Sequence, residues 1–125
     1  GNLRAFRVLV RNAMFRRVQL AAADDIDGLE ALEADNDRFS ADDWDAALGE
    51  YYEQHAQLPD GPEARSPALF VVDDSKPRLW TVHQIIDDPA GDHDWQITAQ
   101  VDLDRSDDEQ VLALVTTGFG QLGAD

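Results

Sequence analysis

Between Trp95 and Leu103, apolar and polar residues alternate without a break, as Trp-Gln-Ile-Thr-Ala-Gln-Val-Asp-Leu. Successive side chains of a β-strand point to opposite faces, so this segment predicts a strand with one packed face and one wet face. Antiparallel sheets commonly leave one face in water. We therefore expect an antiparallel sheet that the rest of the chain covers on one side only.

Three further segments continue the β pattern on either side of this strand. Residues 68–73 form a short apolar run, and residues 79–87 again set apolar side chains on one face. The sequence Asp88-Pro-Ala-Gly91 has the residues that a type I turn prefers at its first, second and fourth positions. Residues 111–117 are expected to form the last strand, after a polar hairpin loop at 104–109. The second half thus predicts a four-stranded antiparallel meander.

The first half of the chain has helical periodicity instead. Residues 3–22 predict one helix with a broad apolar arc, and Arg4, Arg7 and Arg11 form a stripe beside it. Val8 lies beyond that stripe, so the helix is apolar on more than one side. We expect it to pack in the crook of a sheet or against a second surface. The apolar arc consists of Leu3, Phe6, Leu9, Val10, Ala13, Met14 and Leu20.

Two shorter helices are expected to follow. An aspartate at 24–25 can cap a short second helix. Ser40 and Asp43 have the spacing of a capping box at the start of a third helix, and Phe39 and Trp44 have the spacing of a hydrophobic staple. The sequence therefore predicts an α+β fold of about three N-terminal helices and a meander, with the helices on one face. A cone like that of cystatins or nuclear transport factors is a candidate for this architecture.

The length of 125 residues fits one domain. We assign residues 3–119 to that domain and residues 120–125 to a loose tail. The longest apolar run, Ala68–Val72, is too short for a membrane helix, and five arginines in residues 3–22 argue against a secretory signal. The chain has no cysteine, which excludes disulfides and thiolate chemistry and suits a cytoplasmic location.

The charge is strongly acidic and unevenly distributed. Ten basic and 26 acidic residues give a net charge of −16, which disfavours direct binding of nucleic acid. Residues 1–22, however, hold five arginines and no acidic residue. The stripe of Arg4, Arg7 and Arg11 is therefore a candidate interaction surface. It could contact phosphates, but we favour pairing with Asp and Glu of this domain or of a neighbour.

The turn after the second strand is the richest cluster of candidate ligands. Asp88, Asp92, His93 and Asp94 could together contact a metal ion, although their spacing matches no EF-hand. Turns attract Asp, Pro and Gly for conformational reasons alone. We favour the structural interpretation, and we assign no catalytic residue and no cofactor to the chain.

Other polar residues allow a functional and a structural interpretation. Gln84 interrupts an apolar strand face and, beside Tyr51, could line a ligand pocket in a cone-like fold. A glutamine paired with backbone is the alternative that we favour. His55, His83 and His93 are spread over a helix, a strand and a turn, which favours structural roles.

Several motifs together resemble a known family. The first two are Leu3-Arg-Ala-Phe-Arg7 and Arg11-Asn-Ala-Met-Phe-Arg-Arg17. Gly61-Pro-Glu-Ala-Arg-Ser-Pro-Ala-Leu-Phe70, Trp80-Thr-Val-His-Gln-Ile-Ile-Asp-Asp-Pro-Ala-Gly-Asp-His-Asp-Trp95 and Val101-Asp-Leu103 follow. Over residues 3 to about 117, the chain resembles the extreme C-terminal part of the domain of unknown function that follows the motor in a group of bacterial DEAD/DEAH box helicases.

The resemblance implies a parent protein that is an ATP-dependent superfamily 2 helicase. This chain holds neither a Walker A motif nor an Asp-Glu-x-Asp/His box, so no catalytic residue of the motor maps onto it. It would then be an accessory module that binds no ATP. Its expected partners are the motor domains of the parent chain or another protein, with no membrane involved.

Two alternatives remain open at this stage. A free-standing cone-fold protein that binds or transforms a small molecule would need a closed cavity lined by Gln84, Tyr51 or a histidine. An acidic mimic of nucleic acid would need carboxylates spaced along one ridge. The Asp-rich segment 24–45 is the candidate for that ridge, with a solvated helix face as the interpretation that we favour.

Overall fold

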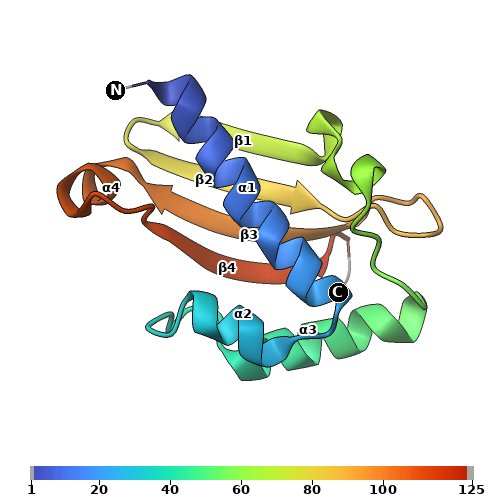
Figure 1. The fold of residues 1–125 in the computed structure, drawn as a ribbon. Coiled ribbons are helices and arrows are strands. Elements are labelled where there is room, and N and C mark those ends of the chain that lie inside the picture. Colours follow the sequence, from blue (N-terminus) through green and yellow to red (C-terminus); the bar gives the residue numbers. More distant parts are fainter. Residues whose placement is uncertain (1, 124–125) are drawn as a thin grey trace.

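The computed structural model describes residues 2–123 and confirms an α+β fold (Figure 1). The helices are α1 (Leu3–Ala22), α2 (Ile26–Leu32), α3 (Ala41–Gln54) and α4 (Leu103–Glu109). Two short 3-10 turns, η1 (Pro62–Arg65) and η2 (Pro67–Leu69), lead into the sheet. The strands are β1 (Phe70–Lys76), β2 (Leu79–Ile85), β3 (Trp95–Asp102) and β4 (Leu114–Gln121).

The strands form one antiparallel sheet in the order β1-β2-β3-β4, which is the predicted meander. Along β3 the buried side chains alternate with partly exposed ones, as the sequence pattern predicts. In β2 the same alternation holds, and Trp80 lies opposite Val101 while Val82 lies opposite Ala99. One face of the sheet is therefore packed and the other is polar and partly exposed.

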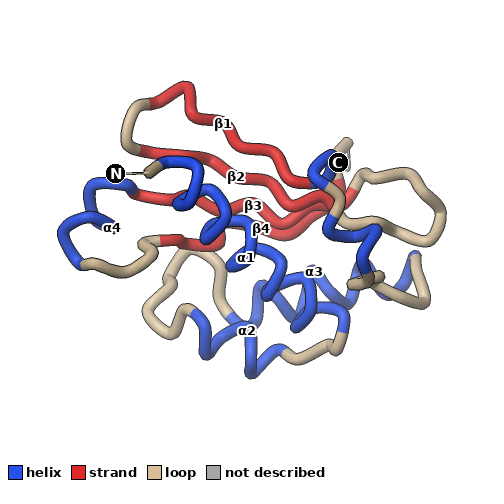
Figure 2. Tube along the Cα trace, turned by 45° about the horizontal axis from the view of Figure 1, so that its top comes forward, coloured by secondary structure: helices blue, strands red, loops and turns tan. Residues whose placement is uncertain are grey.

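The helices cover only the packed face. Figure 2 shows the strands as one layer with α1, α2 and α3 on one side of it. In Figure 1, α1 runs diagonally across the sheet, with its N-terminal end near β1 and β2. The expectation of helices on one face is confirmed for these three elements. None of the described helices combines the length and the apolar character needed to cross a membrane.

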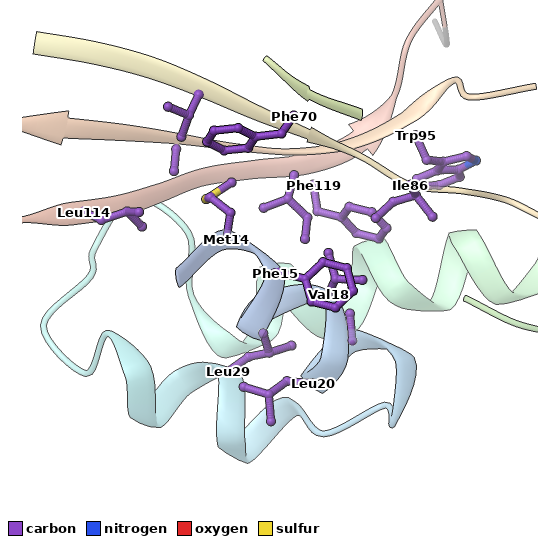
Figure 3. Packing of buried hydrophobic residues seen from close by; sticks show 14 of the residues in the cluster. Met14, Phe15, Val18, Leu20, Leu29, Phe70, Ile86, Trp95, Leu114 and Phe119 are labelled. Atoms are coloured by element: carbon purple, nitrogen blue, oxygen red, sulfur yellow. The ribbon is translucent and has the colours of Figure 1, made fainter. Parts of the chain in front are cut away.

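The core lies between α1 and the sheet. Met14, Phe15 and Val18 of α1 are buried and lie toward the strands in Figure 3. Farther from the sheet, buried Leu20 of α1 lies near buried Leu29 of α2. Because the C-terminal half of α1 has packed neighbours on several sides, it contributes most of the buried residues of this helix.

Aromatic rings connect α3 to the end of the sheet. Trp44 stacks on Phe119 of β4 at 5.8 Å between ring centroids. Tyr51 meets Trp95 of β3 edge to face at 5.3 Å. Such pairs contribute about 0.5–1.5 kcal/mol beyond the area that they bury. They fix α3 beside β3 and β4.

The predicted helix starts are confirmed. Asp25 caps α2 by accepting a hydrogen bond from the Gly28 amide at 2.8 Å. At α3, Ser40 and Asp43 form a reciprocal capping box. The expected staple is also present, since the rings of Phe39 and Trp44 lie 5.1 Å apart.

Two predictions about the C-terminal region are wrong. Residues 104–109, expected to be a loop, belong to α4, because Asp102 caps the helix and Arg105 pairs with Glu109 one turn later. The last strand consequently begins at Leu114 rather than at 111 and continues through Gln121. Of the expected loose tail 120–125, residues 120 and 121 are therefore strand, and residues 124–125 lie outside the described part.

Candidate interaction surface

Three of the four candidate metal ligands, Asp88, His93 and Asp94, have side-chain partners within the domain. Burial raises the pKa of the Asp88 carboxyl, but hydrogen bonds from the amides of Asp92 and His93, at 3.1 and 2.7 Å, outweigh this effect and lower it overall. The Asp88 carbonyl closes the predicted turn with the Gly91 amide at 2.9 Å. This carboxylate therefore organises the backbone of the turn.

His93 and Asp94 also contact protein groups, whereas the exposed Asp92 side chain forms no hydrogen bond or ion pair among the described residues. His93 lies 3.2 Å from Asp87, and one Asp94 oxygen accepts from Gln121 at 2.7 Å. The second Asp94 oxygen is buried with no partner among the described residues. Within residues 2–123 there is no group of three or more His, Asp or Glu side chains that could hold a metal ion.

The two candidate pocket residues are hydrogen-bonded to backbone. Gln84 is 2% exposed, and its amide donates to the carbonyls of Leu69 and Ile85 at 3.1 and 3.3 Å. Tyr51 donates its hydroxyl to the Gln57 carbonyl at 2.7 Å, and burial, with a smaller effect of nearby carboxylates, raises its pKa. The larger hollows of the described surface are not lined by Gln84 or Tyr51.

The acidic segment 24–45 is partly built into the fold. Asp25 and Asp43 cap helices, and Glu33 receives hydrogen bonds from Arg17 and Thr116. These carboxylates are held by helix ends and by a buried network. The three positions therefore have structural uses that need no basic partner.

Glu33 is the centre of that buried network. Its carboxylate accepts from Arg17 Nη2 at 2.9 Å, from the Thr116 amide at 2.6 Å and from the Asn36 amide group at 3.1 Å. The side chains of Arg17 and Glu33 are only 6% and 11% exposed. The network joins α1, the residue after α2 and β4, and sequence periodicity alone gave no sign of it.

The arginine stripe makes a different set of contacts. The Arg7 guanidinium lies 5.6 Å from the centroid of the Phe70 ring. Arg11 donates to the Arg65 carbonyl at 2.6 Å, and Arg65 in turn donates to Asn12 at 3.0 Å. All of these partners are neutral.

The predicted pairing of the stripe with carboxylates of this domain is not present. Among residues 2–123, ion pairs form at Arg17, Arg78 and Arg105, and none forms at Arg4, Arg7 or Arg11. Arg17 lies in the same segment without Asp or Glu, yet it meets Glu33, 16 positions away, through the tertiary fold. The local sequence therefore does not decide which arginines of α1 form ion pairs.

Beside the stripe, the N-terminal half of α1 exposes large apolar side chains. Leu3, Val8 and Leu9 are 57%, 51% and 57% exposed. Val8 and Leu9 are consecutive residues on the side of the helix opposite Leu3, and we call these two residues the outer face of α1. The sequence placed Leu3 and Leu9 on the packed arc, but the sheet covers a narrower part of the helix than that arc. Val8 was predicted to lie outside the arc.

A hollow of about 320 Å³ lies at the same end of α1. Its lining is half apolar, from Leu3, Phe6 and Leu103, and half polar, from Asn2, Arg78 and Asp107. Phe6 packs edge to face on Trp80 at 5.4 Å, which fixes this end of the helix on the sheet. The hollow could therefore receive a side chain with both apolar and polar groups from another surface.

The fold and this surface define a small α+β domain with an apolar and basic helix face left open to solvent. The chain belongs to the family described as a domain of unknown function, DUF3516, whose family model matches residues 1–119. No curated protein and no solved structure matches the chain.

Proposed function

We propose that this chain is a non-catalytic accessory domain of an ATP-dependent DEAD/DEAH box nucleic-acid helicase, and that it docks on the motor. The family to which the chain belongs is described only as a domain of unknown function. The helicase part of the proposal rests on the motifs of residues 3–117 that resemble the region after the motor in such helicases. The domain would then work in the cytoplasm with its motor and would bind no ATP itself.

The observation that carries the proposal is the outer face of α1. Val8 and Leu9 are each more than half exposed and adjacent on this face, and Leu3 is exposed on another side of the same half of the helix. Burying the exposed half of such side chains stabilises a complex by about 1 kcal/mol each. Clustered apolar side chains on a charged surface are typical of a protein contact. The hollow beside Leu3 adds a receiving site at the same end.

The polar candidates support a non-catalytic role. Asp88, Gln84 and Tyr51 are each committed to backbone groups of this domain. A catalytic group needs a free atom beside its substrate. Recruitment of a further protein through the same helix face is the other use that this surface supports.

Deletion of residues 3–125 from the parent helicase tests the proposal. We expect ATPase activity to persist and unwinding per ATP hydrolysed to change, because an accessory domain alters coupling rather than hydrolysis. Both rates are measured at two salt concentrations. Loss of ATPase activity, or unchanged values of both rates, would contradict docking on the motor.

A further inference from the structure

We infer that the arginines along α1 and η1 recognise a carboxylate-rich protein surface on the helicase body. We call Arg4, Arg7, Arg11 and Arg65 the arginine seam. This inference rests on the proposed function, because it names the chemistry of the surface that receives the domain. It concerns other residues than the outer face of α1 and has its own test.

The seam is held in place by groups that carry no charge. Arg65 lies with its guanidinium 4.4 Å from the centroid of the Phe15 ring and donates to Asn12. Arg11 donates to the Arg65 carbonyl, and Arg7 lies over Phe70. Aromatic faces and amide oxygens orient a guanidinium without neutralising it. Since each guanidinium has five N–H donors, most donors of the seam stay open to an added ligand.

The seam gathers four positive charges on a strongly acidic molecule. The whole chain has a net charge of −16, yet the described residues provide no ion pair to any arginine of the seam. Arg17, Arg78 and Arg105 do form ion pairs with carboxylates of the fold. The seam differs from them in that its charge is not neutralised within the described residues, so an anionic partner can still pair with it.

The surroundings of the seam favour a protein over nucleic acid. Leu3, Val8 and Leu9 expose apolar surface on the same half of α1, which a phosphate backbone cannot cover. The acidic remainder of the domain repels a long polyanion, whereas a local patch of Asp and Glu meets the seam at short range. Arginine binds carboxylates through two parallel hydrogen bonds. A patch that is acidic and partly apolar therefore fits both halves of this surface.

Zero-length coupling with a carbodiimide in the full-length helicase tests the inference. The reagent joins an amine to a carboxylate in contact with it, and arginine does not react. Arg4→Lys and Arg7→Lys, made singly, keep the positive charge and place an amine on the seam. The exposed Lys76 on β1, the sole lysine of the chain, is an amine outside the seam and serves as the internal control.

We expect cross-links from the substituted positions to Asp or Glu of the helicase body, located by mass spectrometry. Their yield should fall at least about fivefold between 50 and 500 mM salt, because added ions screen exposed charge pairs. Lys76 should give none to the body. Cross-links that reach only carboxylates within residues 2–123, or a yield that salt does not change, would overturn the inference.

A second pair of variants separates this inference from the proposed function. Val8→Ser/Leu9→Ser removes the outer face, and Arg7→Gln/Arg11→Gln removes charge from the seam. If the first variant alters unwinding while the second gives wild-type unwinding and salt dependence, docking stands and the arginine inference fails. If neither variant alters unwinding and no cross-link forms, both fail. Weaker oligonucleotide binding by the second variant, without a cross-link to the body, would assign the seam to nucleic acid instead.

Discussion

Replacement of Glu33 by alanine removes one carboxylate from the junction of α1, α2 and β4. In the native structure this carboxylate accepts from two nitrogens of Arg17 at 2.9 and 3.1 Å. It also accepts from the amide and the hydroxyl of Thr116 at 2.6 and 2.5 Å. Glu33→Ala would therefore leave a buried guanidinium without its counter-charge and a strand amide without its acceptor.

The expected cost follows from these contacts. Breaking a buried ion pair from one side typically costs about 3–5 kcal/mol. In Glu33→Ala, Arg17 still donates hydrogen bonds to the Ala13 carbonyl at 2.8 Å and to the Thr116 hydroxyl at 3.0 Å. These remaining bonds reduce the loss of stability. We expect Glu33→Ala to lower the free energy of unfolding by about 4 kcal/mol, a large share of the 5–15 kcal/mol of an ordinary domain.

Substitution of Arg17, the ion-pair partner of Glu33, should lower the free energy of unfolding by a smaller amount. After Arg17→Met the carboxylate of Glu33 keeps three donors from Thr116 and Asn36, so we expect a loss of about 2–3 kcal/mol. The double variant Arg17→Met/Glu33→Ala should lose less free energy of unfolding than the sum of the two single losses, because no charge is left unpaired. Urea unfolding of the purified chain, followed by tryptophan fluorescence, measures all three. A loss below about 1 kcal/mol for Glu33→Ala, or additive losses, would refute the role of this pair.

Two further predictions concern glycine and a buried carboxyl. An added Cβ at Gly28 would lie 2.6 Å from an Asp25 oxygen and 2.9 Å from Leu20, so Gly28→Ala should destabilise the domain by about 1–3 kcal/mol. At Gly49 of α3 an added Cβ would meet nothing within 4 Å, so Gly49→Ala should stabilise the domain by about 0.5–1 kcal/mol. Equal urea midpoints for the Gly28→Ala and Gly49→Ala variants would contradict the predicted difference between these two sites. The pKa of Asp88 is lower in the folded protein than in the unfolded chain, so the ionised carboxylate stabilises the fold. This stabilisation is complete above the unfolded pKa of about 3.9, and it is lost as pH falls through the pKa of the folded protein. Asp88→Asn should therefore flatten the decline of the urea midpoint below pH 4, and an unchanged slope would contradict the assignment.

Local sequence signals predicted much of this fold. The alternation after Trp95 predicted a half-buried strand, and the capping residues Ser40 and Asp43 predicted where α3 begins. Alternation and capping depend only on residues a few positions apart, so they can be recognised without knowledge of the tertiary fold. The short helix α4 was missed because its residues after Leu103 are all polar, and because its cap at Asp102 lies within the alternating pattern of the preceding strand.

The candidate surface was predictable only in part. The basic stripe and the place of Val8 outside the apolar arc followed from helical angles, but the exposure of Val8 and the partners of Arg11 did not. Arg65 lies 54 positions away in the sequence and meets α1 only through the tertiary fold. The exposure of Leu9 likewise depends on how far the sheet extends over the helix. The interpretations of Gln84 as a pocket residue and of Asp88 as a metal ligand depend on the hydrogen-bond partners of these side chains, which only the tertiary structure shows.

The most direct test of docking compares two matched variants of the full-length helicase. Val8→Ser/Leu9→Ser removes exposed apolar side chains from the outer face of α1, and Val111→Ser/Leu122→Ser removes equally exposed ones elsewhere, at 58% and 56%. The measured quantity is base pairs unwound per ATP hydrolysed. We expect the first variant to shift this ratio as deletion of the domain does, because about 2–3 kcal/mol of contact is lost, while the second keeps the wild-type ratio. Equal ratios for both variants would contradict docking through α1.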